Sequence, residues 1–332
     1  MTNWLIYALG GGWGHLTRAL SLGRIAATQT KVTIITNSPY AKILRNEGCL
    51  LHQISHELDF NATCEQVRQI LLNTHYDCLI VDTFPRGLGG ELADILPQLH
   101  KIPRILIHRD INPIYVTTKN LHSFVAANFD LTLVPGEGKN LPFCDLPNIQ
   151  HTAPWLIRNR FELPNTTIAR SHLLKVNHSA KIILVCAAGL NSELPFYSNL
   201  ALELHEIFDN CAVRILAASC PPECPQDLWI SHHPGIECLA AADVVVGGGG
   251  YNTVYECAAV GVPLVAFAFK RLYDRQHKRV SVVYPARNIA DAVETLRKVL
   301  DRINTKMILS VPDYINGAVQ AVRLIEGVLN VD

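Results

Sequence analysis

The sequence predicts an α/β protein with two domains, each a parallel sheet covered by helices on both faces. Short apolar runs rich in Val, Ile and Leu alternate with longer amphipathic segments, the order that gives parallel strands joined by helices. A glycine-rich turn follows an apolar run at Gly10 and again at Gly247, so the pattern has two halves. The 332 residues, 49% of them hydrophobic, are enough for two cores at roughly 100–200 residues per domain.

The first domain should span residues 1–157. It opens with a strand at Trp4–Leu9, a turn at Gly10–Gly14 and an amphipathic helix at His15–Ala27. Strands and helices then alternate as strand Lys31–Ile35, helix Tyr40–Asn46, strand Cys49–Ile54, helix Glu65–Leu72, strand Cys78–Val81, helix Gly87–Leu99, and strands Arg104–Ile107 and Leu131–Val134. Pro154 and Pro164 interrupt the pattern, and we expect the interdomain connector there.

The second domain should span residues 165–313, followed by a closing helix within residues 314–332. Its predicted elements are strands Lys181–Cys186, Val213–Ala217, Asp243–Val246 and Pro263–Phe267, and helices Tyr251–Val260, Ile289–Leu300 and Tyr314–Leu329.

Charge and cysteine content exclude several classes of protein. Lys and Arg number 29 against 29 for Asp and Glu, so the chain lacks the positive charge that nucleic-acid binding requires, and no nucleic-acid partner is expected. The ten cysteines are scattered through predicted strands and helices, which favours buried thiols over a disulfide framework. Cys220 and Cys224 with His232 and His233 form only a weak zinc pattern, and we expect a loop there. Without a signal-like opening or a run of ~20 apolar residues, the protein should be cytoplasmic.

The segment from Asp243 to His277 combines three types of binding residue. A strand passes through Gly247–Gly250 into a helix, and glycines there let an anion approach the unpaired N–H groups of the helix start. This suits a diphosphate without a metal ion. Glu256 could accept both hydroxyls of a ribose, while Asp274 and Gln276 follow a parallel strand where sugar hydroxyls would be read. The alternative is that the glycines only turn the chain and Glu256 is a solvated charge.

This set of motifs resembles the donor-binding half of the GT-B glycosyltransferases, especially the bacterial N-acetylglucosaminyltransferase that forms lipid II and the UDP-glycosyltransferase C-terminal domain family. The resemblance implies a GT-B fold, with two Rossmann-like domains whose parallel sheets face each other across a cleft, and a closing helix at 314–332 that crosses back to the N-terminal domain. Carried over by position, it implies that Glu256 holds the ribose, that Asp274 and Gln276 hold the sugar, with His277 where relatives often have a second Gln, and that the phosphates are lined by Gly249, Gly250, Tyr251, Asn252 and Thr253.

The amino-terminal sequence GGGWGHLTRAL resembles the acceptor-side loop of the same family. The resemblance implies that His15 is the base that takes the acceptor proton, with Gly12, Gly14 and Arg18 beside the acceptor. A helix N-terminus lowers an imidazole pKa and keeps it neutral, as a base requires. His15 as a helix cap or a phosphate contact is the alternative. A dinucleotide site is not supported, because His15 stands where the third fingerprint glycine belongs.

Two loops after buried strands of the first domain supply the remaining acceptor-side candidates, which are Asp82, Arg86, His108, Arg109 and Asp110. The carboxyl ends of parallel strands are where α/β sheets bind ligands. The alternative is an Arg–Asp ion pair that only ties two loops together.

The expected function is transfer of a sugar from a UDP-sugar, with UDP-N-acetylglucosamine as first choice, to a hydroxyl acceptor with inversion. The donor is a co-substrate, and no cofactor or metal ion is expected. A UDP-sugar hydrolase or 2-epimerase on the same fold and a non-catalytic sugar-nucleotide sensor are the alternatives. The sequence leaves open whether the acceptor is lipid-linked, whether an apolar patch gives peripheral membrane contact, and the oligomeric state.

Overall fold

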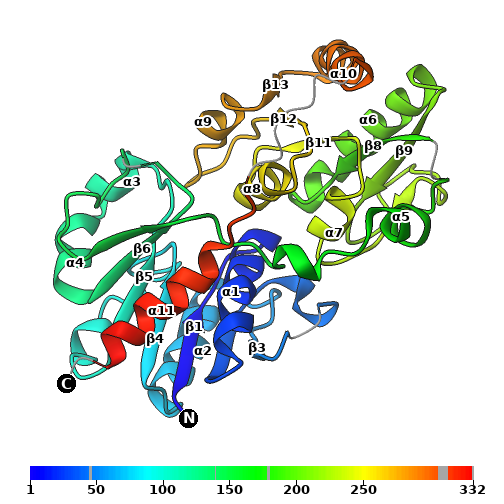
Figure 1. Cartoon of the computed structure of the whole chain (residues 1–332). Helices are drawn as coiled ribbons and strands as arrows, with labels where there is room; N and C mark the ends of the chain where they lie inside the picture. The colour runs from blue at the N-terminus through cyan, green and yellow to red at the C-terminus, as the bar shows by residue number, and fades with distance from the viewer. Residues whose placement is uncertain (45–46, 139, 178–179, 306–312, 331–332) are drawn as a thin grey trace. The chain divides into compact units, whose positions relative to one another are not determined.

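The computed structural model describes residues 1–44, 47–138, 140–177, 180–305 and 313–330. The chain divides into two compact units (Figure 1). Unit 1 comprises Met1–Ile157, Leu272–Asp274 and Asn316–Asp332, and unit 2 comprises Arg158–Arg271 and Arg275–Ile315. Residues 45–46 of the predicted helix Tyr40–Asn46, and residues 306–312 and 331–332 of the predicted second domain and closing helix, lie outside the described residues.

Unit 1 is built on a seven-stranded sheet in the order β3-β2-β1-β4-β5-β6-β7, in which every pair of neighbours is parallel. Its strands are β1 (Asn3–Tyr7), β2 (Lys31–Thr36), β3 (Leu50–Gln53), β4 (Cys78–Asp82), β5 (Arg104–Ile107), β6 (Leu131–Pro135) and β7 (Ile149–Thr152). Its helices are α1 (Trp13–Ala26), α2 (Phe60–Asn73), α3 (Pro113–Thr118), α4 (Leu121–Asn128) and α11 (Gly317–Leu329), with short 3-10 turns η1 (Pro39–Lys42) and η2 (Leu96–Gln98).

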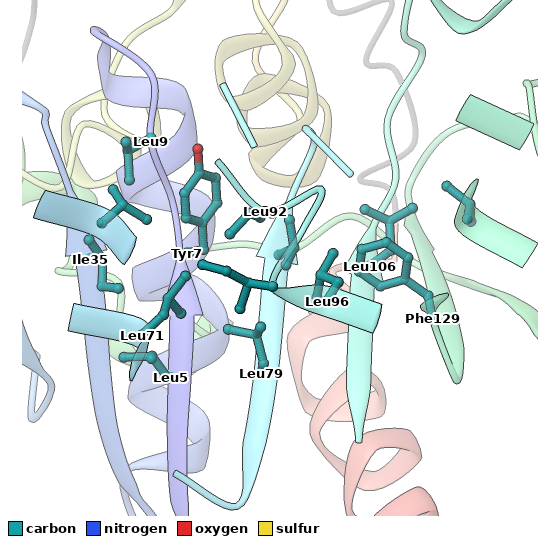
Figure 2. Close-up of a cluster of buried hydrophobic side chains, with 14 of the residues drawn as sticks. Leu5, Tyr7, Leu9, Ile35, Leu71, Leu79, Leu92, Leu96, Leu106 and Phe129 are labelled. Carbon is teal, nitrogen blue, oxygen red and sulfur yellow. The ribbon is translucent and has the colours of Figure 1, made fainter. Parts of the chain in front are cut away.

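Strand alternation divides the apolar residues of unit 1 between the two faces of its sheet. Leu5 and Tyr7 of β1 point to one face, where they join a core with Leu79 of β4 and Leu71 of α2 (Figure 2). Ile6 lies between them in sequence, is also fully buried, and therefore belongs to the opposite face. Because both faces of the strands are buried, the strands are continuous apolar runs, as expected for a parallel sheet.

The last helix, α11, packs against α1, β6 and β7 of unit 1 (Figure 1). Its first residue, Gly317, donates its N–H to the Pro154 carbonyl at 2.9 Å. A Cβ at Gly317 would lie 1.9 Å from the Ala153 carbonyl oxygen. Only glycine fits this approach of the helix start to the backbone after β7.

Unit 2 is built on a six-stranded sheet in the order β10-β9-β8-β11-β12-β13, again parallel at every pair. Its strands are β8 (Lys181–Cys186), β9 (Cys211–Leu216), β10 (Trp229–Ile230), β11 (Val244–Gly248), β12 (Leu264–Phe267) and β13 (Tyr284–Ala286). Its helices are α5 (Thr166–Ile168), α6 (Leu194–Ile207), α7 (Ile236–Leu239), α8 (Tyr251–Val260), α9 (Gln276–Val280) and α10 (Ile289–Asn304), with short helical turns η3 (Arg160–Glu162), η4 (Ala169–Leu173) and η5 (Asn191–Glu193).

Two separate cores cover the two faces of the unit 2 sheet. On one face Leu200 of α6 and Leu296 of α10 pack with Val185 of β8 and the same-facing residues of its neighbours. On the other face Cys257 of α8 and Leu239 of α7 pack with the alternate strand residues. Helix α8 begins at Tyr251, directly after the turn that follows β11.

Most predicted strands are confirmed within one or two residues, but the predicted helix at Gly87–Leu99 is wrong. That segment contains turns and the short η2. Gly87 and Gly90 have φ values of +85° and +92°, which no helix contains. Buried Glu91 also fixes the turn: its carboxylate accepts from the Tyr7 hydroxyl at 2.5 Å and from the Gly89 N–H at 2.8 Å. Tertiary hydrogen bonds therefore outweigh the apolar periodicity of this segment.

The ten cysteines are all free; five are buried as expected, and the other five are half-buried. Among the described residues, no group of three or more His, Cys, Asp or Glu side chains is arranged to hold a metal ion. In the part of the chain that the structure describes, no helix combines the length and apolarity needed to cross a bilayer.

The close approach at Gly317 gives a stability prediction. Gly317→Ala should destabilise the protein by about 1–3 kcal/mol, because the added methyl overlaps the Ala153 carbonyl. Gly327→Ala, in the same helix with no neighbour within 4 Å of its Cβ, should instead stabilise by about 0.4–1 kcal/mol. Urea unfolding followed by circular dichroism measures both, and equal effects would contradict the proposed steric clash.

Candidate functional site

The first turns of α1 lie beside the carboxyl end of β4. β1 pairs with β4 in the register Tyr7 to Val81, so the turn after β1 and Asp82 meet at one edge of the sheet. His15 Nδ1 lies 2.5 Å from Asp82 Oδ2. Arg18, one helical turn on, binds both carboxylate oxygens, with Nε to Oδ1 and Nη2 to Oδ2 each at 2.7 Å. The three residues form a His–Asp–Arg cluster in which Asp82 and Arg18 are fully buried.

Asp82 and His15 affect each other's protonation, and Arg18 affects both. Burial opposes ionisation of Asp82, but the charge of Arg18 and the hydrogen bonds from His15 and Arg18 outweigh it and hold the pKa of the Asp82 carboxyl well below its usual range. Burial lowers the pKa of His15; Asp82 opposes this, and Arg18 and Arg109 add to it. An ionised carboxylate only accepts hydrogen bonds, so Nδ1 of His15 donates and Nε2 carries a lone pair. At neutral pH His15 is therefore a neutral imidazole that can accept a proton.

The glycine turn after β1 makes room for the His15 ring. A Cβ at Gly10 would lie 2.2 Å from His15 Cδ2, whereas Gly12 and Gly14 have open space around their Cβ positions. The ring also stacks on Phe84 at 5.4 Å, and Phe84 contacts Tyr273 edge-on at 5.3 Å. The steric requirement therefore falls on Gly10, which the sequence did not single out.

Tyr273 belongs to a short segment, Leu272–Asp274, that packs with unit 1 although its chain neighbours belong to unit 2. Asp274 forms an isolated β-bridge with Ile111, and its carboxylate lies 3.1 Å from Arg109 Nη2. The residue that the resemblance assigns to the donor sugar is thus held within the same unit as His15. Arg109 is therefore in an Arg–Asp ion pair, but its partner Asp274 belongs to neither of the two predicted acceptor-side loops.

The other acceptor-side candidates differ in exposure. His108 is fully buried against Phe143, and burial lowers its pKa to about 3. Asp110 is also buried. The Arg86 guanidinium lies over the Phe124 ring at 4.4 Å, a cation–π contact. The structure therefore joins His15, Arg18 and Asp82 by hydrogen bonds, with Arg109 close enough to lower the pKa of His15, while His108 and Asp110 are buried.

In unit 2, the turn between β11 and α8 approaches its neighbours closely. A Cβ at Gly247 would lie 2.9 Å from the Cys186 carbonyl oxygen, and one at Gly249 would lie 2.3 Å from a Val280 methyl group. Gly250, the residue before α8, has open space around it. The N-cap residue of α8 is Gly250, which makes no side-chain capping hydrogen bond to the helix start, where backbone N–H groups can bind an anion.

The residues predicted to follow this turn along α8 are mostly buried. Tyr251 and Thr253 are buried, and Asn252 is half-buried. Glu256 is only 7% exposed, and burial raises its pKa to about 8. The predicted solvated charge is therefore not what the structure contains: Glu256 is a sequestered carboxyl group behind the turn, and near neutral pH it is substantially protonated.

The two side chains of the predicted sugar-binding motif have different partners. Gln276 is buried, and its Oε1 accepts from the Phe269 N–H at 3.1 Å. His277 is exposed. Asp274, by contrast, is paired with Arg109 in unit 1. A linear motif gives no sign that its first and third residues have such different environments.

Two ion-pair groups in unit 2 were not identified from the sequence. Glu237 accepts from Arg158 Nε and pairs with His232 Nε2, both at 2.8 Å, so Arg158, which lies between Pro154 and Pro164, is held by an ion pair. Arg271 pairs with Glu193 at 2.5 and 2.9 Å. The only sequence signal for Arg271 is the cationic run of Lys and Arg around the Asp274 motif.

The raised pKa of Glu256 predicts a pH-dependent stability. The pKa of an unfolded glutamate is near 4.5 and that of folded Glu256 is about 8, so between these values the folded state binds more protons than the unfolded state. The free energy of unfolding should therefore fall as pH rises from about 5 to 8, by up to about 1.4 kcal/mol per pH unit. Glu256→Gln should remove this slope. Urea unfolding at pH 5.5, 7 and 8.5 measures it, with exposed Glu294→Gln as the control; parallel profiles for Glu256→Gln and the native chain would contradict the prediction.

No protein-family model and no curated protein matches the sequence. Solved structures match along the whole chain. The glycotransferase of kitacinnamycin is 17% identical, with 99% of both chains covered and a TM-score of 0.60. MnaA of S. aureus in a structure with UDP is 11% identical; the match covers 100% of this chain and 98% of that one, with a TM-score of 0.62. The spinosyn rhamnosyltransferase SpnG with thymidine diphosphate is 14% identical; the match covers 98% of this chain and 96% of that one, with a TM-score of 0.57. Together with the two parallel sheets, these similarities show that the chain has the GT-B glycosyltransferase fold.

Proposed function

We propose that the protein transfers a sugar from a UDP-sugar to a hydroxyl acceptor with inversion, without a metal ion or other cofactor. The observation that carries the proposal is the His15–Asp82 pair, with its 2.5 Å hydrogen bond at the carboxyl edge of the unit 1 sheet. A neutral imidazole oriented by a buried carboxylate is suited to take a proton from a hydroxyl group. Solved structures with this fold include one named a glycotransferase and one named a rhamnosyltransferase, and these support the assignment.

The donor is assigned to the turn before α8. MnaA and SpnG were each solved with a nucleoside diphosphate, UDP in one and thymidine diphosphate in the other. The uncapped N-terminus of α8 offers N–H groups and a positive helix end to such a diphosphate. Glu256 would bind the ribose hydroxyls from the same helix. We take UDP-N-acetylglucosamine as the first donor to test.

The proposed reaction is a single displacement. Nε2 of His15 takes the proton of the acceptor hydroxyl as its oxygen forms a bond to the anomeric carbon. The bond from that carbon to the phosphate oxygen breaks on the opposite side, which inverts the configuration, and the nucleoside diphosphate leaves with the bonding electrons. Asp82 keeps Nδ1 as the donor and stabilises the imidazolium that forms. Helix α8 stabilises the departing diphosphate.

Asp274 adds a second contact to this scheme. We assign its carboxylate to a hydroxyl of the transferred sugar, as the resemblance implies. Arg109 would then orient Asp274 through their 3.1 Å pair. Arg109 also contributes to lowering the pKa of His15, so the sugar ligand and the base share one positively charged neighbour. In this proposal Arg109 is a positioning residue.

Nucleotide binding tests the donor assignment. Isothermal titration with UDP, thymidine diphosphate, GDP and NAD should show binding of UDP and no binding of NAD. Glu256→Ala should weaken UDP binding by about 1–3 kcal/mol, because the ribose hydroxyls lose their hydrogen-bond partner in a buried site. The Glu294→Ala variant, altered at an exposed site, should bind as the native chain does. Unchanged UDP affinity in a folded Glu256→Ala protein would remove Glu256 from the site.

Turnover tests the base. With UDP-N-acetylglucosamine or UDP-glucose and a panel of hydroxyl compounds, His15→Ala should slow UDP release by about 10²–10⁴-fold while leaving donor affinity nearly unchanged. His75→Ala is the matched control, because His75 also lies near an aspartate, Asp77 at 3.5 Å, but is 83% exposed. A full-rate His15→Ala variant would exclude His15 as the base. Release of free sugar without an acceptor would favour a hydrolase.

A further inference from the structure

Three strands of unit 2 end side by side at one edge of the sheet. Gly247 of β11 pairs with Cys186 of β8, and Gly248 pairs with Phe267 of β12. The segments that follow these three strands therefore start next to one another, at the edge where parallel sheets bind ligands. The segment after β12 carries Arg271.

The Arg271 guanidinium reaches from the segment after β12 to the turn after β8. Its Nη1 and Nη2 lie 2.5 and 2.9 Å from the two carboxylate oxygens of Glu193. A Cβ at Gly189 would be 3.6 Å from Arg271 Nη2. The side chains are 21% and 11% exposed for Arg271 and Glu193, and Ala188 and Leu190 of the turn are exposed. The pair is accessible to a ligand at the turn.

Glu193 has two roles in this arrangement. Its Oε2 also accepts from the Leu190 N–H at 3.1 Å, which holds the turn after β8 in place. Its carboxylate presents two oxygens to the planar fork of Arg271, the geometry that a pair of phosphate oxygens would also present. The Glu193 carboxylate thus occupies the hydrogen-bonding groups of Arg271 that an anion bound at this turn would use.

A second feature is directed at the same strand ends. Tyr197 of α6 is 1% exposed, and its hydroxyl oxygen lies 3.0 Å from the Cβ position of Gly248. The N-terminus of α8 supplies about half a positive charge. A nucleoside diphosphate carries at least two negative charges, so one further cation at this edge is a substantial contribution.

We propose that Arg271 binds the diphosphate of the nucleotide donor and that Glu193 holds Arg271 until the nucleotide displaces it. The proposal rests on the function proposed above and adds a residue and an exchange of partners to it. Glu193 and the diphosphate compete for one guanidinium. Removing Arg271 should therefore weaken binding of the diphosphate, and neutralising Glu193 should strengthen it.

The test compares Arg271→Gln and Glu193→Gln by isothermal titration with UDP and uridine. Arg271→Gln should weaken UDP binding by about 10-fold or more, as expected for loss of a charged hydrogen bond, and leave uridine binding within about twofold. Glu193→Gln keeps an oxygen for the Leu190 N–H and should tighten UDP binding by about two- to fivefold, because a partly exposed ion pair no longer competes. Arg287→Gln and Glu294→Gln, at an exposed arginine and an exposed glutamate of the same unit, are the controls.

The opposite signs separate this proposal from a structural role. Both substitutions break the same ion pair, so a pair that only stabilises the loop would weaken UDP binding in both variants, and that result would overturn the proposal. Unchanged UDP binding in Arg271→Gln would overturn it too, while leaving the proposed function intact if the native chain binds UDP. If the native chain binds no UDP, titration with inorganic pyrophosphate decides: binding lost in Arg271→Gln supports the anion role alone, and no binding to the native chain rejects both.

Discussion

The buried carboxylate of Asp82 is the constraint on which the candidate site depends. A carboxylate without solvent must be neutralised or paired, because an isolated charge in the interior costs several kcal/mol or more. Arg18 supplies the opposite charge and two hydrogen bonds, and His15 forms a further hydrogen bond to the same carboxylate. One carboxylate therefore fixes the first turns of α1 against β4 and sets the tautomer of the imidazole.

This arrangement also explains why His15 differs from an ordinary His–Asp pair. Arg18 already compensates the negative charge, so Asp82 orients the ring more than it raises its basicity, and burial keeps the pKa of His15 low. The exposed His75 near Asp77 has the same residue types without the burial or the arginine. The chemistry of the site comes from the environment of the pair and not from its composition.

The sheets were predictable because buried parallel strands carry their own signal. Runs such as Lys181–Cys186 and the helix at Tyr251–Val260 are found where the sequence places them, since apolar runs and the glycine turn act locally. The segment Gly87–Leu99 was not predictable, because its shape depends on the bond from Tyr7, 84 residues away, to Glu91.

The candidate site also divides into residues that the sequence predicts and contacts that it does not. His15, Glu256 and Asp274 belong to local motifs, whereas the bonds from Arg18 to Asp82 and from Arg271 to Glu193 depend on contacts distant in sequence. The periodicity of apolar residues gives no sign of these two contacts.

The path of the chain has a consequence for how the protein is made. Unit 1 is completed by α11, which packs on α1, and unit 2 is made of residues that lie between these two helices in sequence. During synthesis the sheet of unit 1 emerges first, but the helix that covers β6 and β7 arrives only after nearly all of unit 2 has been translated. Unit 2 is thus an insertion that can fold first, and the amino-terminal unit must wait with an uncovered apolar face. Of these two units, the one whose strands are synthesised first is therefore the one that is completed last.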